Sequence, residues 1–244
     1  MSSNAAPDQS QSIYLNLITM IVALLVPVVF ILGAVRLLLT PAYLVIEYNT
    51  PNFPADRFGF TKEDRLYWGH LAVEYLLNDE DISYLGELRF PAGQLVPPQS
   101  CQFMKDCSQF YNDRELGHML DVKNVVQAAL KVWYLAIAGI LGAGIWSYYG
   151  KSWANFKKGL NWGGWLTVFF ILTIILLVII AFGFIFVLFH QVFFDSGTWT
   201  FLYSDSLIRL FPERFWRDTF LAVGILAGGA GLLLALLTKK RAEK

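Results

Sequence analysis

The chain of 244 residues has little charge and little histidine. Asp, Glu, Lys and Arg make up only 16% of it and cancel to a net charge of zero, while histidine occurs three times and cysteine twice. It contains no basic stripe for nucleic acid, no glycine-rich phosphate loop and no GxSxG nucleophile motif. These absences argue against a nucleic-acid-binding protein and against a serine hydrolase of that type. Nothing in the sequence points to a bound nucleotide, metal or other cofactor, and we expect none.

Long hydrophobic runs are what the chain has instead. Apolar residues make up 56% of it, and the mean hydropathy is +0.48. Four runs are each long enough to cross a hydrocarbon core of about 30 Å as a helix. They are Leu15 to Leu39, roughly Val125 to Ser147, Trp165 to Phe189, and Phe220 to Leu237. The first is too long for a removable signal peptide and has no preceding Lys or Arg, so we expect a permanent anchor. The sequence therefore predicts an all-α membrane protein with four transmembrane helices.

Clusters of cations predict the orientation of these helices. One cluster lies between the second and third runs, and the other follows the fourth run; their members are Lys151, Lys157 and Lys158, then Lys239, Lys240, Arg241 and Lys244. Cytoplasmic loops are enriched in Lys and Arg, so we expect both clusters, and with four spans both termini, on the cytoplasmic side. The expected location is a cell membrane, with residues 40–124 and the loop 190–218 outside.

Residues 40–124 predict an extracellular α+β cap between the first two spans. Tyr43 to Tyr48 is expected to be extended, and Thr61 with Asp64 three residues later predicts the start of a helix. Asn112 or Asp113 can cap a helix that runs into the second span. The predicted layout is a tail and first helix at 1–39, the cap at 40–124, and helices two to four at 125–244.

Both cysteines lie in this cap, as Cys101 and Cys107. A pair on the oxidising side of a membrane is most simply a disulfide that closes a small loop. The five residues between them do not fit a redox CxxC pair, and the nearby sequence offers no His and Cys set with metal-ligand spacing.

Two of the three histidines, His118 and His190, fall where predicted spans reach the same side of the bilayer. His118 precedes Val125 on one helix and so stands about 10 Å further out, at headgroup depth. His190 follows directly on Phe189, at a similar depth. Imidazoles titrate near neutral pH, so such a pair could move protons beside an ester bond. Ionisable residues at a membrane border can also be simple polar anchors. We interpret His70 as a surface or core histidine of the cap.

Four further polar residues are candidates to support the histidines. Asp121 lies one helical turn after His118 and could orient its imidazole, although it could also belong to a solvated helix face. Attack on an ester creates an oxyanion that needs hydrogen-bond donors. The candidate donors in the predicted outer segments are Arg65, Arg114 and Lys123.

The loop 190–218 is unusually rich in aromatic residues. So many aromatic side chains cannot remain in water, and polar residues interrupt the segment too often for it to span the membrane. It is therefore expected to lie in the membrane interface, as an aromatic belt or as a lid that guides an acyl chain. The candidate substrate- or lipid-facing residues are Phe193, Phe194, Trp199 and Phe211.

The histidine segments resemble those of the bacterial lipoprotein intramolecular transacylases, a family of four-span membrane proteins. The matching residues are His-Met-Leu-Asp-Val-Lys from His118 and Phe-His-Gln-Val-Phe-Phe from Phe189, followed by Trp199, Asp205, Leu207, Ile208, Leu210, Phe211, Pro212 and Glu213. The resemblance implies transfer of an acyl chain from the sn-2 position of a lipoprotein's S-linked diacylglycerol onto the α-amino group of its first cysteine. The product is the lyso-form lipoprotein, and the implied partners are that lipoprotein and membrane lipid.

The residues fit this reaction without reference to the family. An α-ammonium group with a pKa near 8 must lose a proton before it attacks an ester, and a neutral histidine is a suitable base. Because the amine and the ester belong to one molecule, no Ser or Cys nucleophile is needed.

Two other classes of protein remain open at this stage. A claudin-like structural protein also has four spans and a large outer loop with two cysteines, although Trp68 in Tyr-Trp-Gly-His does not give the Trp-Gly-Leu-Trp-Cys-Cys pattern. A membrane cytochrome could ligate haem through His118 and His190 if the two face each other across a cavity.

Overall fold

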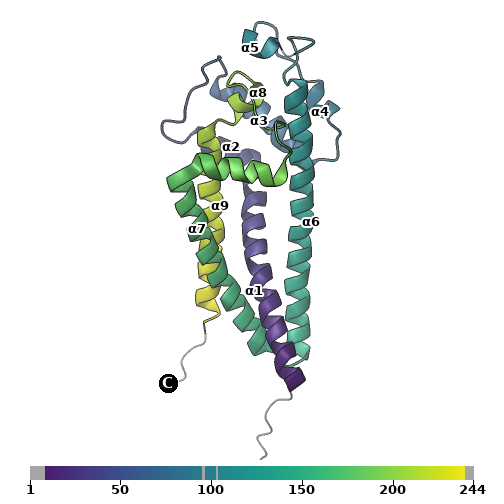
Figure 1. The fold of residues 1–244 in the computed structure, drawn as a ribbon, viewed down its shortest axis with the longest axis vertical. Coiled ribbons are helices and arrows are strands. Elements are labelled where there is room, and N and C mark those ends of the chain that lie inside the picture. Colours follow the sequence, from purple (N-terminus) through teal and green to yellow (C-terminus); the bar gives the residue numbers. More distant parts are fainter. Residues whose placement is uncertain (1–8, 95–96, 103, 240–244) are drawn as a thin grey trace, which may run out of the picture. The chain divides into compact units, whose positions relative to one another are not determined.

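The computed structural model describes residues 9–94, 97–102 and 104–239, and helices dominate this part of the chain (Figure 1). The helices are α1 (Gln9–Leu38), α2 (Pro41–Tyr48), α3 (Lys62–Leu77), α4 (Ser83–Gly86), α5 (Pro98–Cys101), α6 (Asp113–Tyr149), α7 (Trp153–Phe193), α8 (Ser206–Leu210) and α9 (Glu213–Leu237). They form two compact units. The first unit comprises the described residues up to Val35, Lys131–Leu176 and those from Ala222, and the second comprises Arg36–Leu130 and Leu177–Leu221.

Four helices are long and apolar enough to cross a membrane. They cover Tyr14–Leu38 of α1 and the whole of α6, α7 and α9. Each contains one of the predicted hydrophobic runs, so the prediction of a multi-pass integral membrane protein with four helical spans is confirmed. Three of them, α6, α7 and α9, extend beyond the apolar runs because polar turns continue the helix. His118 and His190 lie in such turns, near one end of α6 and of α7.

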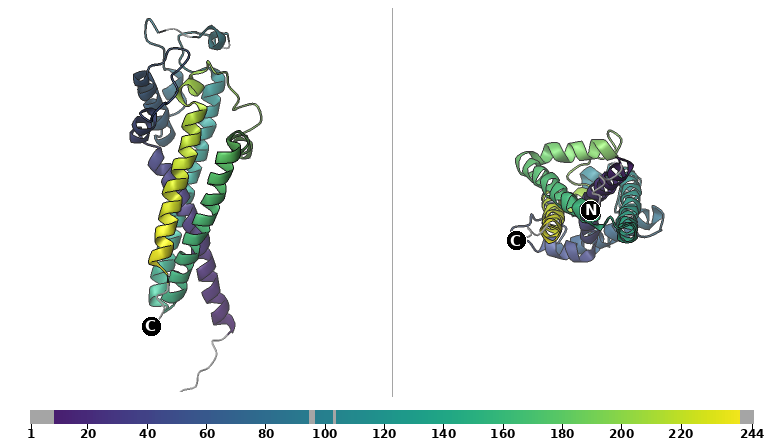
Figure 2. Two further views of the ribbon diagram at one scale, coloured as in Figure 1. Left: turned by 90° about the vertical axis from the view of Figure 1, so that its left-hand side faces the viewer. Right: turned by 90° about the horizontal axis from the view of Figure 1, so that it is seen from below.

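Two adjacent glycines hold α7 against both of its neighbours in the first unit, where α7 in green runs beside α1 in purple and α9 in yellow (Figure 2). A Cβ on Gly163 would come within 2.6 Å of the Val26 Cβ on α1. A Cβ on Gly164 would come within 2.6 Å of the Gly231 carbonyl oxygen on α9. Small residues at such crossings let membrane helices pack backbone against backbone.

The third predicted span is interrupted. Ala181 has non-helical dihedral angles (φ −145°, ψ 49°), so α7 consists of two helical stretches joined at a kink. Gly183 follows closely and lowers the local helix propensity. The stretch from the kink to Phe193 carries His190 and belongs to the second unit.

The prediction that Tyr43 to Tyr48 is extended is wrong, because this segment is the helix α2. The Thr40 hydroxyl accepts a hydrogen bond from the Tyr43 backbone N–H and caps the helix, and Pro41 occupies its first turn. The buried residues Tyr43, Leu44, Glu47 and Tyr48 recur at helical spacing. Capping and this spacing outweigh the strand propensity of Val45 and Ile46.

The prediction of an α+β cap is corrected for the same segment. Between residues 40 and 124, the described part contains helices and only one isolated β-bridge, Arg89 to Gln109. Phe90 donates to the Ser108 carbonyl (2.8 Å) and Phe110 donates to the Leu88 carbonyl (3.0 Å). The prolines that follow Phe90 lack an N–H, so this pairing does not extend into a strand. The cap is helical.

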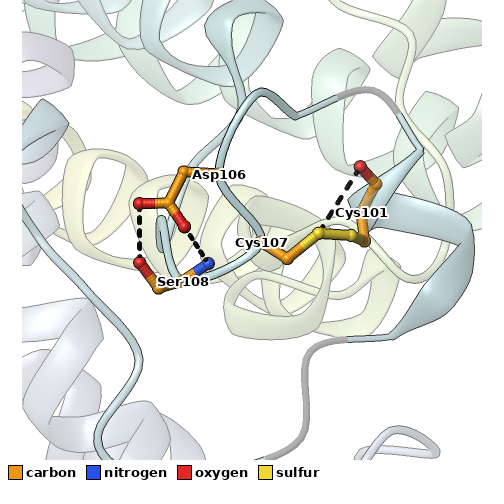
Figure 3. The surroundings of a disulfide bond; sticks show 4 residues. All are labelled: Cys101, Asp106, Cys107 and Ser108. Atoms are coloured by element: carbon orange, nitrogen blue, oxygen red, sulfur yellow. Dashed lines mark hydrogen bonds between the residues drawn. A yellow bond between two sulfur atoms is a disulfide. The ribbon is translucent and has the colours of Figure 1, made fainter.

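Cys101 and Cys107 are joined by a disulfide, as predicted, with their Cα atoms 5.0 Å apart (Figure 3). The Asp106 carboxylate accepts hydrogen bonds from the Ser108 backbone N–H (2.9 Å) and hydroxyl (2.8 Å), which orders the end of this loop. The predicted start of α3 is also confirmed: the Thr61 hydroxyl accepts from the Asp64 N–H, and the Asp64 carboxylate accepts from the Thr61 N–H.

A buried acid lies on the inner face of α2. Glu47 is only 3% exposed, and its Oε1 accepts no hydrogen bond within the described residues. Burial, with the negative charge of Asp218 nearby, raises the pKa of Glu47 from 4.5 to about 7. Arg214, which pairs with Asp218 at 2.8 Å, offsets part of that charge. The folded protein therefore holds this proton more tightly than the unfolded chain does.

We expect Glu47→Gln to stabilise the protein at pH 8 and to have little effect near pH 4.5. Because the pKa is raised in the folded state, the wild type loses stability as pH rises from 4.5 to about 7, whereas glutamine does not titrate. A gain of about 1 kcal/mol corresponds to a rise in Tm of about 2–4 °C in a protein of this size. The measurement is thermal unfolding across this pH range. The exposed Glu87→Gln is the control, and an identical pH profile for Glu47→Gln and wild type would contradict the assignment.

Candidate active site

The structure brings His118 and His190 together in the second unit. Their ring centroids are 6.0 Å apart and their planes are inclined by 21°. His118 lies in the second turn of α6 and His190 near the end of α7. The two side chains are only 7% and 9% exposed. Two of the three histidines therefore form one buried pair.

The hydrogen bond of His190 defines which of its nitrogens is available. Nδ1 lies 2.7 Å from the backbone carbonyl oxygen of Phe186, four residues earlier in the helix. A carbonyl oxygen only accepts, so in the neutral ring Nδ1 carries the proton and Nε2 carries the lone pair. The Nδ1 of His118 is buried and has no partner within the described residues. The pair thus holds one oriented base and one imidazole nitrogen without an assigned role.

Aromatic side chains enclose the two imidazoles. Phe194 packs against both rings, at 4.9 Å from His118 and 5.6 Å from His190. Phe201 lies 5.3 Å from His118, and Trp199 lies 4.9 Å from His190. These distances are typical of aromatic contacts, so the walls of the site are apolar and pack closely. Of the predicted lipid-facing residues, Phe194 and Trp199 therefore belong to the histidine site.

The other two predicted lipid-facing residues lie differently. Phe193 is 48% exposed, next to Phe189 at 4.9 Å. Phe211 is 7% exposed and packs against Phe215 at 5.0 Å, so it has little surface to offer a lipid.

Glu115, one turn before His118, was missed by the sequence analysis. Glu115 is only 1% exposed. Its Oε2 accepts a hydrogen bond from the Asn112 N–H (2.8 Å), and its Oε1 accepts one from the Leu207 N–H (2.7 Å) at the start of α8. Asn112 in turn accepts from the Arg114 and Glu115 N–H groups, at 3.0 Å each. Asn112-x-x-Glu115 is a capping-box pattern that the sequence could have revealed, whereas the bond to Leu207 has no local signal. Glu115 thus ties the His118 helix to the loop that carries Trp199 and Phe201.

Arg114 and Asp205 form a second link between α6 and the same loop. Arg114 lies 3.5 Å from the Asp205 carboxylate and 5.9 Å from the centre of the Phe201 ring. Asp205 is fully buried and also accepts the Leu202 N–H at 2.9 Å. Of the three predicted donors, Arg114 is the one that the structure places beside an aromatic residue of the site.

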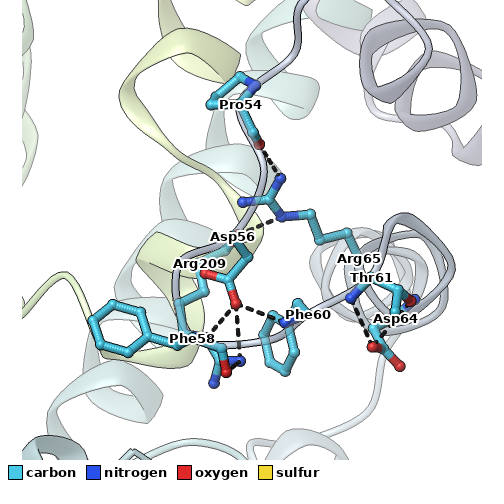
Figure 4. A network of polar contacts seen from close by, with 8 residues as sticks. All are labelled: Pro54, Asp56, Phe58, Phe60, Thr61, Asp64, Arg65 and Arg209. Atoms are coloured by element: carbon cyan, nitrogen blue, oxygen red, sulfur yellow. Dashed lines mark hydrogen bonds and ion pairs between the residues drawn. The ribbon is translucent and has the colours of Figure 1, made fainter.

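Arg65 instead belongs to a structural network (Figure 4). It donates to the backbone carbonyls of Arg209 (2.8 Å) and Pro54 (2.6 Å). The Arg209 side chain pairs with Asp56 at 3.0 Å, and both side chains are almost completely buried. This network fixes α8 against the segment that precedes α3, and it uses the donors of Arg65 for that purpose.

Lys123 and Asp121 also lie apart from the imidazoles. The Lys123 ammonium donates to the Asn78 side chain (3.0 Å) and the Glu80 carbonyl, and it lies 4.1 Å from the centre of the Tyr75 ring. It therefore secures the end of α3. The Asp121 side chain has no hydrogen bond or ion pair within the described residues, and its backbone belongs to α6. His70 is exposed and lies 3.7 Å from the Glu74 carboxylate on the same helix.

Four membrane-length helices and a buried histidine pair define this chain as a polytopic membrane protein with an apolar imidazole site. The model of the family described as lipoprotein intramolecular transacylase Lit matches residues 18–216. Since this match covers most of the chain, the protein belongs to the Lit family. It is therefore a membrane transacylase, and the claudin-like alternative is wrong.

A relative in sequence and the similar solved structures each match most of the length of this chain. An uncharacterized protein of Aquifex aeolicus (strain VF5) is 29% identical over 220 residues, which are 90% of this chain and 92% of that protein. The structure of the lipoprotein intramolecular transacylase Lit from Bacillus cereus superposes with a TM-score of 0.72 at 23% identity, covering 93% of this chain and 95% of that one. A form of the same protein with one histidine replaced by alanine gives a TM-score of 0.67 at 22% identity over 94% of each chain. These structures share the fold.

The geometry also disfavours haem between the histidines. A bis-histidine macrocycle would occupy the plane midway between the two rings. Phe194 is nearly equidistant from both rings, at 4.9 Å and 5.6 Å, and so lies in that plane.

We expect Glu115→Gln to lower both stability and activity. Glutamine has one accepting oxygen where Glu115 has two, so either the Asn112 or the Leu207 N–H is left buried without an acceptor. Such a loss costs about 1–3 kcal/mol, and it loosens the loop against α6. The measurements are the unfolding temperature and the turnover rate well below it.

Asn112→Ala is the matched control, because it removes the cap of α6 but keeps the Leu207 bond. It should cost about 1 kcal/mol of stability with a smaller effect on turnover. Equal turnover in wild type and Glu115→Gln would show that the bridge does not position the site.

Proposed function

We propose that this protein moves the sn-2 acyl chain of a diacylglyceryl-cysteine lipoprotein onto the α-amino group of that cysteine, giving the lyso-form. The observation that carries the proposal is the buried imidazole pair, in which His190 directs a lone pair from Nε2. Membership of the lipoprotein intramolecular transacylase family supports the substrate class.

The two imidazoles carry out the proton transfers of the proposed reaction. The neutral α-amine attacks the sn-2 carbonyl carbon, and Nε2 of His190 takes a proton from the amine nitrogen. The tetrahedral intermediate then collapses: the carbonyl forms again and the bond to the sn-2 oxygen breaks. That oxygen receives the proton from the His190 imidazolium, either directly or through His118, which gives up one proton and takes one from His190. One amide forms, one ester is lost, and the two histidines end as they began.

The aromatic enclosure suits this chemistry in two ways. Phe194, Phe201 and Trp199 keep water from the imidazoles, so the ester is transferred and not hydrolysed. They also offer an apolar surface to an acyl chain. We infer the same lipid-facing role for the exposed Phe193, whereas the buried Phe211 packs inside the protein.

A mixture of two substrates, one with heavy and one with light acyl chains, tests whether the transfer is intramolecular. When lipoprotein with isotopically heavy chains is mixed with lipoprotein with light chains, each N-acyl chain should match the isotope of the S-glyceryl chain beside it. A well-aligned amine on the same molecule has an effective concentration of about 10⁵ M or more, so it outcompetes any amine from solution. Mass spectrometry of the N-terminal peptide measures the outcome, and abundant mixed-isotope product would overturn the intramolecular reaction.

Histidine variants supply the controls for this assay. His118→Gln and His190→Gln should each lower product formation by about 10²-fold or more, because proton transfer is lost. His70→Ala should retain most activity, since His70 is exposed and bonded only to its own helix. Full activity in His118→Gln would contradict a shared role for the pair.

We infer further that both termini are cytoplasmic and that the histidine site serves the outer leaflet, with residues 40–124 as the outer domain. The support is the cation-rich linker at Lys151, Lys157 and Lys158, together with a disulfide in the 40–124 segment. Lys239 at the end of α9 adds to this bias, while Lys240, Arg241 and Lys244 lie outside the described residues.

Thiol labelling of intact cells tests this orientation. An impermeant reagent should modify Cys101 and Cys107 only after a reductant is added, because the disulfide protects both sulfurs. A membrane-permeable reagent after the same reduction is the control for reactivity. Labelling by the permeable reagent alone would place this segment on the cytoplasmic side.

A further inference from the structure

The proposed reaction needs a hydrogen-bond donor that the histidine pair does not supply. When the amine attacks, the sn-2 carbonyl oxygen gains negative charge, and stabilising that charge is usually the largest single contribution to acyl transfer. Arg65 and Lys123 are bonded within the cap, and Arg114 is paired with the buried Asp205. The remaining donor close to the imidazoles belongs to the aromatic wall, and the inference rests on the proposed function.

The indole N–H of Trp199 is buried and unpartnered. Its Nε1 has no acceptor within the described residues, although the ring lies 4.9 Å from the His190 ring. An indole nitrogen can only donate, and leaving such a donor buried without a partner costs about 1–3 kcal/mol. Buried polar groups are rarely left unsatisfied, so this one calls for a functional explanation.

Five hydroxyl groups in the described part of the chain are also buried without a partner, those of Tyr75, Tyr111, Ser100, Ser147 and Ser152. Tyr75 stacks on Tyr84 in the cap, at 6.2 Å, and Tyr111 packs against Phe110, at 4.8 Å. Ser100 lies in α5, Ser147 near the end of α6 and Ser152 just before α7. Trp199 differs from the two tyrosines because its ring contacts an imidazole of the site.

The loop holds Trp199 in place from both sides. Before it, the Thr198 backbone N–H (3.2 Å) and hydroxyl (2.9 Å) both donate to the Asp195 carbonyl, and Gly197 takes a left-handed conformation (φ 87°). After it, the Leu202 N–H is bonded to the buried Asp205. A donor fixed before the reaction needs no reorganisation when charge develops, which is the condition for effective stabilisation.

We propose that the Trp199 Nε1–H donates a hydrogen bond to the carbonyl oxygen of the sn-2 ester as that oxygen becomes negatively charged. The amine nitrogen bonds to the carbonyl carbon, its proton passes to His190 Nε2, and the carbonyl electron pair moves onto the oxygen that faces Trp199. The bond to the sn-2 oxygen then breaks, and the hydrogen bond weakens as the amide carbonyl forms. A neutral donor of this kind brings no charge into an apolar enclosure.

Trp199→Phe should lower kcat by about 10²–10³-fold, the usual cost of removing one oxyanion donor, while KM changes by less than about threefold. Phenylalanine keeps an aromatic ring beside His190 but has no N–H. The measurement is lyso-lipoprotein formation by the full-length protein with diacylglyceryl lipopeptide as substrate.

An isosteric replacement separates the hydrogen bond from the shape of the ring. Incorporation of β-(3-benzothienyl)alanine at position 199 keeps the bicyclic ring and replaces N–H by sulfur, so it should reproduce the loss of kcat. Trp216→Phe is the matched control, because its ring contacts Phe211 and Phe186 and not a histidine. That variant should turn over at the wild-type rate.

The outcomes separate this inference from the proposed function. Wild-type kcat in either Trp199 variant would overturn the inference, and so would a rise in KM at constant kcat, which indicates lipid packing alone. If the wild type forms no lyso-lipoprotein while it is folded, the proposed function fails instead. Loss of activity in Trp216→Phe equal to that in Trp199→Phe would also overturn it, by showing that any indole in this region is needed.

Discussion

The carboxyl group of Glu115 is the contact on which the histidine site depends. It accepts the Asn112 N–H at the start of α6 and the Leu207 N–H at the start of α8, and Leu207 lies 92 positions after Glu115 in the chain. Burying an acid is costly, and two short hydrogen bonds from backbone N–H groups offset that cost. Because both N–H groups are fixed, the loop before α8 cannot shift without exposing one of them. The positions of Trp199 and Phe201 relative to His118 follow from this bridge.

A second buried network extends that anchorage into the cap. The Arg209 side chain extends from α8 and pairs with the Asp56 carboxylate, while the Arg209 backbone carbonyl accepts a hydrogen bond from Arg65 on α3. Removing one partner of a buried pair is far more costly than the pair's net contribution, so such networks specify one arrangement. The aromatic enclosure of the imidazoles is therefore supported from two directions, by α6 through Glu115 and by the cap through Arg209. The cap is a scaffold for the site.

The sequence predicted the features that have a local or periodic signal. Four apolar runs gave the spans, Thr61 and Asp64 gave the start of α3, and the scarcity of histidine singled out His118 and His190. The sequence carries no signal for contacts between distant residues. Arg65 is one of three cations in outer segments that it offers, unranked, as oxyanion donors, and the partners of Arg65, Pro54 and Arg209, become its neighbours only in the folded chain. The segment from Tyr43 to Tyr48 was misread because strand propensity is weaker than a capped, buried helical face.

The chemistry explains why such a sparse set of polar groups is enough. In an intramolecular transfer the substrate brings both the nucleophile and the ester, so the protein contributes positioning, proton movement and local stabilisation of charge. In the proposed reaction a neutral imidazole takes a proton and returns it within one turnover, so the proton transfer needs no permanent charge beside lipid, where charge is expensive. Two charged groups beside the aromatic wall, Arg114 and Asp205, pair with each other at 3.5 Å. An apolar wall of Phe194, Phe201 and Trp199 around two imidazoles suits the proposed reaction.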